Sequence, residues 1–217
     1  MIRTAPEGKW FIVGAWVIAA ALLVLAYRTD SLLWWGISVM WIVLAVWVVA
    51  FFRDPVRMGE RGDRFILAPA DGKVVSVLET EEPAFFAGRA ARVSIFMNVF
   101  NCHVNRYPTD GTVAYRHYNP GKFGHAAAEK SSLDNEQSSV GLSTTRGKVL
   151  VRQIAGLVAR RIVTDHSVGT PVKQADRLGM IRFGSRVDIF LPTNSTRVLV
   201  KVGDTTIAGV TVVAEWI

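Results

Sequence analysis

Two long uncharged segments near the start of the chain place the strongest constraint on its fold. Residues Trp10 to Tyr27 and Ser31 to Phe52 contain no charged side chain, and together they hold six of the seven tryptophans. Each is long enough to cross the roughly 30 Å hydrocarbon core of a bilayer as a helix, at about 1.5 Å per residue. The sequence therefore predicts a membrane hairpin over residues 1–52, with helices at about 10–27 and 31–52.

A signal peptide and a pair of soluble core helices are the two alternatives to the hairpin. A cleaved signal peptide accounts for the basic start and the first apolar run, but not for the longer second run that begins four residues later. Soluble core helices would have to be apolar on every face, which is rare in a chain of 217 residues. The membrane hairpin is the favoured interpretation.

Basic residues flank the hairpin on one side. Arg3 and Lys9 precede the first segment, Arg28 is the only basic residue at the tip, and four arginines follow the second segment: Arg53, Arg57, Arg61 and Arg64. Because cytoplasmic flanks are enriched in Lys and Arg, this bias places both ends of the hairpin in the cytoplasm. We therefore expect a cell-membrane protein whose larger domain, residues 53–217, lies on the cytoplasmic side.

The composition of the larger domain limits the kinds of binding partner that it is expected to have. Residues 53–217 contain 22 Lys and Arg against 16 Asp and Glu, a net charge of +6. A basic domain tethered to a membrane points toward anionic lipid surfaces as partners, and a merely solvated basic face explains the charge equally well. The chain lacks helix-turn-helix, zinc and RNA-binding signatures, so no nucleic-acid partner is expected. The single cysteine, Cys102, rules out an internal disulfide and fits a reducing compartment.

Short β-type runs bounded by turn residues dominate the sequence after Arg53. The expected strands are Gly72–Leu78, Arg92–Asn98, Thr112–His117, Lys148–Val151, Arg161–Val163, Arg186–Leu191, Thr196–Val202 and Val210–Glu215. Segment 153–160 fits either a helix or a bulged strand, and segment 123–139 reads as an irregular loop. We predict a mainly β (α+β) protein, with a compact antiparallel β domain after the apolar helices. A faint echo among residues 68–78, 169–183 and 200–215 suggests barrel features of the biotinyl/lipoyl type.

Several short stretches, taken in order, resemble one family. They are "FFRDPVR" (51–57), "APADGKV" (68–74), "VSIFMNVFNCHVNRYPTDG" (93–111), "DNEQ" (134–137), "QIAGLVARRIV" (153–163) and "IRFGSRVDIFLP" (181–192). The combination resembles the short bacterial and archaeal form of phosphatidylserine decarboxylase, which is made as a proenzyme. The resemblance runs from about Phe51 to Ile217.

The resemblance gives the Gly-Ser pair in "RFGSR" a role. By itself, a glycine and serine inside a strand indicate a bend or bulge. The resemblance implies self-cleavage between Gly184 and Ser185, giving chains 1–184 and 185–217 of a two-chain protein and converting Ser185 into a covalent pyruvoyl cofactor. That group forms a Schiff base with the substrate amine. The implied activity is that of a carbon–carbon lyase, decarboxylating phosphatidylserine to phosphatidylethanolamine in phospholipid biosynthesis.

Two further residues match family positions. Asp71, in "PADG", matches an aspartate of the self-cleavage machinery, although Asp-Gly is also a common hairpin turn. His103, in "NCHVNR", matches a histidine near the pyruvoyl that donates a proton to the product carbon, although a lone strand histidine is often structural. Longer members carry a second histidine where this chain has Arg106, which leaves open which group activates Ser185.

The remaining candidates are weaker. Cys102 fits a small core residue, "NPGKFG" (119–124) fits a plain turn better than a phosphate loop, and no metal site is expected because His117, His125 and His166 lack ligand spacing. An alternative function is a membrane-anchored biotinyl/lipoyl-like adaptor or carrier, with Lys73 for attachment. A pyruvoyl decarboxylase acting on a soluble amino acid is disfavoured, because such a substrate gives no reason for the two apolar segments. Oligomers beyond the two-chain unit stay open.

Overall fold

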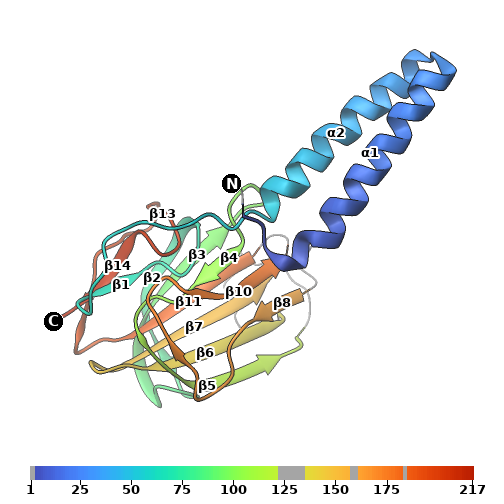
Figure 1. Cartoon of the computed structure of the whole chain (residues 1–217). Helices are drawn as coiled ribbons and strands as arrows, with labels where there is room; N and C mark the ends of the chain where they lie inside the picture. The colour runs from blue at the N-terminus through green and yellow to red at the C-terminus, as the bar shows by residue number, and fades with distance from the viewer. Residues whose placement is uncertain (1–2, 122–134, 157–160, 183–184) are drawn as a thin grey trace. The chain divides into compact units, whose positions relative to one another are not determined.

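The computed structural model describes residues 3–121, 135–156, 161–182 and 185–217. The chain forms two compact units, residues 1–56 and 57–217 (Figure 1).

The N-terminal unit is a helical hairpin. A short 3-10 helix, η1 (Pro6–Gly8), leads into α1 (Lys9–Thr29), and α2 (Leu32–Phe51) follows after a two-residue turn. Small side chains are buried where the two helices meet, and the Trp41 indole donates a hydrogen bond to the Ala15 carbonyl at 2.8 Å. Most large apolar side chains point outward, as expected for helices whose surroundings are themselves apolar. Both helices are long and apolar enough to cross a membrane.

The C-terminal unit is built from short antiparallel strands. They are β1 (Phe65–Leu67), β2 (Gly72–Glu82), β3 (Gly88–Met97), β4 (Val104–Arg106), β5 (Gly111–Asn119), β6 (Gln137–Ser143), β7 (Lys148–Ala155), β8 (Arg161–Thr164), β9 (Pro171–Val172), β10 (Arg177–Arg182), β11 (Ser185–Pro192), β12 (Thr196–Val198), β13 (Thr205–Thr206) and β14 (Val212–Trp216).

One large sheet and two small ones arrange these strands. The large sheet has the order β13-β2-β3-β11-β7-β6-β5-β9 and curls into a half-barrel. The small sheets have the orders β1-β14-β12 and β4-β10-β8. Every strand pairing in the described residues is antiparallel (Figure 1).

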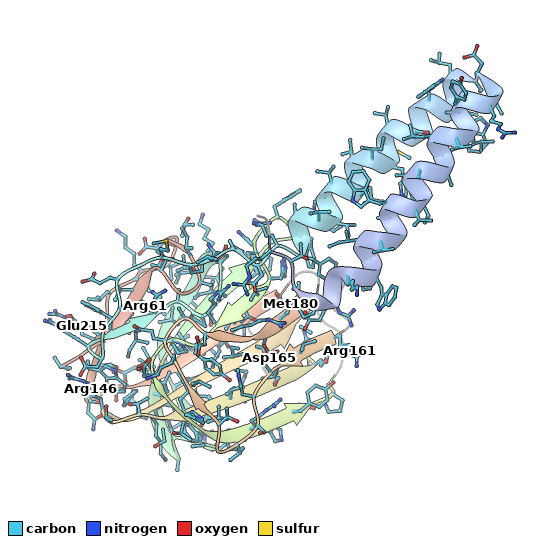
Figure 2. The ribbon with its side chains drawn as sticks, viewed as in Figure 1. Arg61, Arg146, Arg161, Asp165, Met180 and Glu215 are labelled. Carbon is cyan, nitrogen blue, oxygen red and sulfur yellow. The ribbon has the colours of Figure 1, made fainter. Side chains whose placement is uncertain are left out.

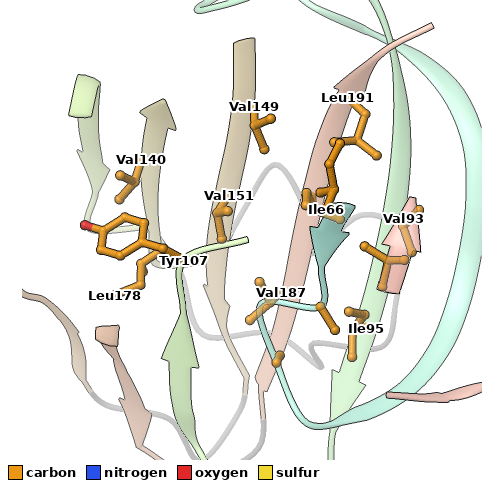
Figure 3. Packing of buried hydrophobic residues seen from close by; sticks show 14 of the residues in the cluster. Ile66, Val93, Ile95, Tyr107, Val140, Val149, Val151, Leu178, Val187 and Leu191 are labelled. Carbon is orange, nitrogen blue, oxygen red and sulfur yellow. The ribbon is translucent and has the colours of Figure 1, made fainter. Parts of the chain in front are cut away.

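The hydrophobic core lies against one face of the large sheet. Because side chains alternate along a strand, Val187, Ile189 and Leu191 of β11 share this face, whereas Phe190 packs on the other. Ile66 of β1 and Leu178 of β10 belong to the same core cluster, so the small sheets cover this face (Figure 3).

Strand β11 lies inside the large sheet and is paired along both edges. Its residues Ser185 to Pro192 pair with β3, from Met97 to Ala90, and residues Ser185 to Phe190 also pair with β7. The segment that contains the Gly-Ser pair therefore leads directly into one of the most extensively paired strands of the protein.

The predicted fold class is confirmed, since the protein is mostly antiparallel β with two N-terminal apolar helices. Two local predictions need correction. Residues 137–139, predicted as part of a loop, begin β6, and the expected strand 196–202 ends at Val198. Residues 153–155, which fitted either a helix or a strand, are the end of β7. The short strands β1, β4, β9, β10 and β13 were not predicted.

Candidate active site

Ser185 is wholly buried at the first position of β11. It is paired with Met97 of β3 on one side and Ala155 of β7 on the other. Its hydroxyl donates a hydrogen bond to the Met97 sulfur, with 3.4 Å between Oγ and Sδ. The side chain therefore lies on the core face of the sheet, shielded from water. Gly184 falls outside the described residues.

His103 lies beside β10, the strand that precedes Ser185. The Ile181 amide donates to the His103 carbonyl at 3.3 Å, and the next residue, Val104, is paired with Met180. Figure 2 labels Met180 on this strand. His103 is wholly buried, and only three residues separate Ile181 from Ser185 in the sequence, so His103 lies at the same end of the β unit as the serine.

The tautomer of His103 follows from its backbone partner. Nδ1 lies 3.0 Å from the carbonyl oxygen of Asn101. Because a carbonyl oxygen can only accept a hydrogen bond, the proton is assigned to Nδ1, and Nε2 is the basic nitrogen of the neutral ring. His103 can accept a proton at Nε2 and return it, which is the chemistry of a general acid and base.

A tight turn between β3 and β4 fixes the Asn101 carbonyl. The amide of Asn98 donates to the Asn101 side-chain oxygen at 2.9 Å, and the Asn101 amide donates back to the Asn98 carbonyl at 3.0 Å. The amide of Phe100 donates to the Asn98 side-chain oxygen at 2.9 Å. These asparagine side chains stabilise the turn in the manner typical of Asn, and so orient the His103 ring.

Asp71 lies in the turn between β1 and β2. Arg57 Nη2 lies 2.8 Å from Oδ1 and 2.7 Å from Oδ2, and the Ala208 amide donates to Oδ1 at 2.8 Å. The next residue, Gly72, packs so closely on β3 that an added Cβ would lie 2.2 Å from the Phe96 carbonyl oxygen. Only glycine permits this approach, which brings the turn to the end of β3.

Asp71 and Ser185 lie on opposite sides of β3. Lys73 of β2 and Arg186 of β11 are both paired with Phe96. At about 4.8 Å between neighbouring strands, Lys73 and Arg186 are roughly 10 Å apart across the sheet, and so are the starts of β2 and β11. Among the described residues, no hydrogen bond joins Asp71 to Ser185 or His103. The structure thus brings the three candidates to one end of the sheet without a direct relay between them.

Arg106 lies at the position where the family resemblance implies a second histidine in longer members. Its Nη1 donates to the Ala175 carbonyl at 3.1 Å. Alternation along β4 puts Arg106 on the face opposite His103 and Asn105. Arg106 therefore points away from the side of β4 that carries His103.

The other histidines have partners away from Ser185. The ring of His117 stacks on Tyr115, and His166 Nδ1 lies 3.2 Å from the Tyr107 hydroxyl. Burial raises the pKa of Tyr107 to about 12, so its hydroxyl stays protonated, and the tautomer of His166 decides which of the two groups donates. Lys122 and His125 fall outside the described residues. Within the described ranges, no three His, Cys, Asp or Glu side chains form a metal-binding group.

Sequence reasoning missed three buried or partly buried partners near the site. Arg57 binds Asp71, and the amides of Asn105 and Gln153 lie on the core side of the sheet near Ser185, joined by a hydrogen bond of 2.8 Å. Arg57 is the last residue of the motif "FFRDPVR", so the family resemblance could have identified it as a site residue. Asn105 and Gln153 carry no local signal, because their contact joins residues 48 positions apart.

Comparison with known proteins gives consistent matches over most of the chain. The family model for phosphatidylserine decarboxylase matches residues 44–214. A phosphatidylserine decarboxylase proenzyme of Symbiobacterium thermophilum is 46% identical over 212 residues, covering 97% of this chain and 94% of the relative. A phosphatidylserine decarboxylase proenzyme of Cereibacter sphaeroides is 44% identical over 214 residues, covering 96% of this chain and 88% of the relative.

Proposed function

The chain belongs to the phosphatidylserine decarboxylase family, whose reaction is the decarboxylation of phosphatidylserine, and we propose that it works through a pyruvoyl group made from its own Ser185. Removing CO₂ from the serine headgroup leaves ethanolamine, so the product is phosphatidylethanolamine. The enzyme is a carboxy-lyase of phospholipid biosynthesis. The word proenzyme in the relatives' names supports self-cleavage.

The observation that carries the proposal is the burial of Ser185 at the first position of β11. Ser185 Oγ attacks the Gly184 carbonyl, and an ester replaces the amide. Loss of the Ser185 Cα proton then breaks the Cβ–Oγ bond, leaving a carboxylate on Gly184 and dehydroalanine at residue 185. Water converts the dehydroalanine into the pyruvoyl group and ammonia. A buried position protects these steps from hydrolysis of the ester.

The residues around Ser185 fit such a group. Met97 and Ala155 are small-to-medium apolar neighbours on the paired strands and offer no charged side chain that would compete with the substrate amine. When formed, the pyruvoyl ketone binds that amine covalently and takes up the electron pair released as CO₂ leaves.

We assign His103 to proton transfer at the substrate carbon. Its Nδ1 is engaged with the Asn101 carbonyl, so Nε2 is the nitrogen that accepts and returns protons. His103 also serves as the base of self-cleavage in this proposal, because Arg106 replaces the second histidine of longer members.

We assign Asp71 to self-cleavage as a positioning residue. Its carboxylate, bound by Arg57 and the Ala208 amide, fixes the turn that packs Gly72 on β3 beside Met97. The strand that contacts Ser185 is thereby held in place.

The two apolar helices suggest membrane association, which suits a phospholipid substrate. We propose that the enzyme resides in the cell membrane with residues 53–217 on the cytoplasmic side, because arginines are concentrated after α2 and cytoplasmic flanks are enriched in basic residues. The mature protein consists of chains 1–184 and 185–217.

Intact mass spectrometry of the purified protein tests the proposal. Two chains are expected, the smaller of about 3.6 kDa out of 23.9 kDa. Residue 185 should resist Edman degradation, and borohydride added with phosphatidylserine should trap an adduct there. A single species of full mass that is active on phosphatidylserine would overturn the pyruvoyl assignment.

The position of Lys73 argues against the alternative function as a carrier, which would need an attachment lysine at a hairpin tip. Lys73 lies inside β2, paired with both Phe96 and Thr205, and not at the tip of a hairpin. The family match is to an enzyme, which also argues against a carrier.

A further inference from the structure

A hydrogen-bonded series of polar side chains, buried except for the half-buried Thr164, runs along the core face of the sheet toward Ser185. It begins at Ser138 of β6, whose Oγ lies 2.8 Å from Thr164 Oγ1, and Thr164 donates to Gln153 Oε1 at 3.0 Å. Gln153 Nε2 donates to Asn105 Oδ1 at 2.8 Å, and Asn105 Nδ2 lies 3.7 Å from Met97 Sδ. Asn105 and Gln153 are wholly buried. Burying two amides is costly unless they are hydrogen-bonded, so this chain is a built feature of the core.

The hydrogen bonds of this side-chain series all point the same way. Since Thr164 donates to the Gln153 carbonyl, the Gln153 amide nitrogen faces Asn105. Asn105 must then accept with its oxygen, which turns its own amide nitrogen toward Met97. Every donor in this side-chain series therefore points toward Met97 Sδ, the sulfur next to Ser185.

Two donors converge on that sulfur. Ser185 Oγ lies 3.4 Å from Met97 Sδ, and Asn105 Nδ2 lies 3.7 Å from the same atom. A thioether sulfur is a weak acceptor, so Asn105 Nδ2 is a buried donor whose partner is poorer than an oxygen. An oxygen that gains negative charge beside this sulfur would be a better partner for it.

We propose that Asn105 Nδ2 donates a hydrogen bond to the Ser185 oxygen as the Cβ–Oγ bond breaks, an assignment that rests on the proposed self-cleavage. In that step a base takes the Cα proton, and the C–H electron pair becomes the Cα=Cβ double bond. The Cβ–Oγ electron pair leaves with Oγ, which becomes part of the new Gly184 carboxylate. Asn105 stabilises the charge that develops there, and Gln153 positions Asn105.

The position of Asn105 on β4 supports this role. Asn105 follows His103 by two residues, so the two side chains share one face of the strand. The base and the donor to the leaving oxygen thus come from the same short segment. Gln153 lies on the core face of β7, two residues before Ala155, the partner of Ser185.

Full-length protein made by cell-free synthesis in the presence of lipid nanodiscs tests the assignment, with cleavage followed over time. Asn105→Leu keeps the number and branching of the side-chain heavy atoms and removes the donor, so elimination should slow by about 10²–10³-fold. The ester should then accumulate. Hydroxylamine cleaves an ester, so treating this variant should release a fragment that begins with Ser185 and has a free, Edman-readable amine.

Three further variants make the test specific. Asn105→Asp keeps the acceptor and loses the donor, and its rate relative to the parent should recover as falling pH protonates the carboxyl. Gln153→Leu should show a smaller defect of the same kind, with hydroxylamine-sensitive ester. The matched control is Ser94→Ala, because Ser94 is buried on the opposite face of β3 and its Oγ has no hydrogen-bond partner in the described part of the chain. This control should cleave at the parent rate.

The outcomes separate this inference from the proposed function. If the parent itself stays uncleaved, self-cleavage is wrong. If the parent cleaves and Asn105→Leu cleaves equally fast, only the role of Asn105 is wrong. An Asn105→Leu precursor that resists hydroxylamine, as Ser185→Ala should, would also overturn the assignment, because the defect would precede the ester. A control as slow as Asn105→Leu would do the same.

Discussion

Arg57 and Asp71 form an ion pair in which one guanidinium nitrogen contacts both carboxylate oxygens, at 2.8 and 2.7 Å. Both side chains are largely withdrawn from water, with 14% and 13% of their surfaces exposed. The pair joins the segment that follows the helical unit to the turn that packs on β3. Removing either partner therefore leaves a partly buried group without its counterpart.

Arg57→Gln should lower the free energy of unfolding by roughly 1–3 kcal/mol, less than a fully buried pair because water still reaches both groups. Asp71→Asn should slow self-cleavage, because the turn beside Met97 is less firmly held. Urea unfolding in a Ser185→Ala background measures the first effect on an uncut chain. Exposed Arg89→Gln is the control, since its pair with Glu79 lies on the surface. Equal unfolding free energies for Arg57→Gln and Arg89→Gln would contradict the argument.

Ser185→Ala should remain one chain of full mass, fold normally and show no decarboxylation. The substitution removes the only oxygen able to form the ester and leaves a side chain that the buried site accommodates easily. Intact mass, circular dichroism and assay on phosphatidylserine vesicles check the three parts. Ser195→Ala, in the turn after β11, is the control and should be cleaved and active. A cleaved Ser185→Ala protein would place the cut elsewhere.

His103→Gln should lower kcat on phosphatidylserine by about 10²–10⁴-fold with little change in KM, because proton return follows substrate binding. The assay should use only the fraction that has been cleaved, since the same substitution is expected to slow maturation. His117→Gln is the control, because His117 stacks on Tyr115 away from Ser185. A cleaved His103→Gln enzyme with the parent kcat would remove His103 from the mechanism.

The apolar helices should hold the protein in membranes against high salt and alkaline carbonate, because their attachment is hydrophobic and not electrostatic. Protease added to inside-out vesicles should digest residues 57–217, and protease added to intact spheroplasts should spare them. Release by salt alone would argue against spanning helices. The reverse protease pattern would invert the proposed orientation.

Acid should weaken the β1-β14-β12 sheet through Glu215. Its hydrogen bond from Arg197, assisted by Arg64, holds the pKa of Glu215 below its usual 4.5. A lowered folded-state pKa stabilises the protein above the unfolded value, and this contribution is lost as pH falls through the folded value. Glu215 lies on β14 and is labelled in Figure 2.

Glu215→Gln should therefore flatten the fall in stability between about pH 5 and 3, measured by urea unfolding in the Ser185→Ala background. Exposed Glu60→Gln serves as the control for a simple loss of charge. An unchanged slope in Glu215→Gln would mean that its arginine partners do not stabilise the folded state.

Much of the fold could be predicted from the sequence, because it depends on local patterns of apolar and charged residues. The helices follow from uncharged runs, and β11 follows from its run of β-branched and apolar residues after Ser185. Strand β6, "QSSVGLS", was not predicted, because its serines resemble a loop sequence, and Ser138 and Ser139 are buried only through pairing with neighbouring strands. Strand β10 was also missed. Its Gly179, at φ +158°, lets Val163 approach so closely that an added Cβ would lie 2.0 Å from the Val163 carbonyl oxygen.

The candidate site likewise contains residues that local motifs predicted and residues that only the folded structure reveals. Ser185, Asp71 and His103 were proposed from short motifs, each contiguous in sequence. The amide chain through Gln153 and Asn105 could not be, since it exists only once β4 lies over β7 and brings together residues 48 positions apart. Long-range buried contacts between polar residues leave no periodic trace in the sequence.

The double pairing of β11 would make the proposed self-cleavage a one-way event. Once the proposed cut is made, the small chain begins in the interior of the large sheet, held by strands on both edges. It stays in place while folded, but after denaturation two separate polypeptides would have to meet again, so recovery becomes concentration-dependent. The uncut precursor would then be the form that reaches the fold by itself, and the lifetime of a cleaved enzyme would be set by its unfolding rate, not by an equilibrium with an unfolded chain. A cell can replace a denatured copy only by new synthesis.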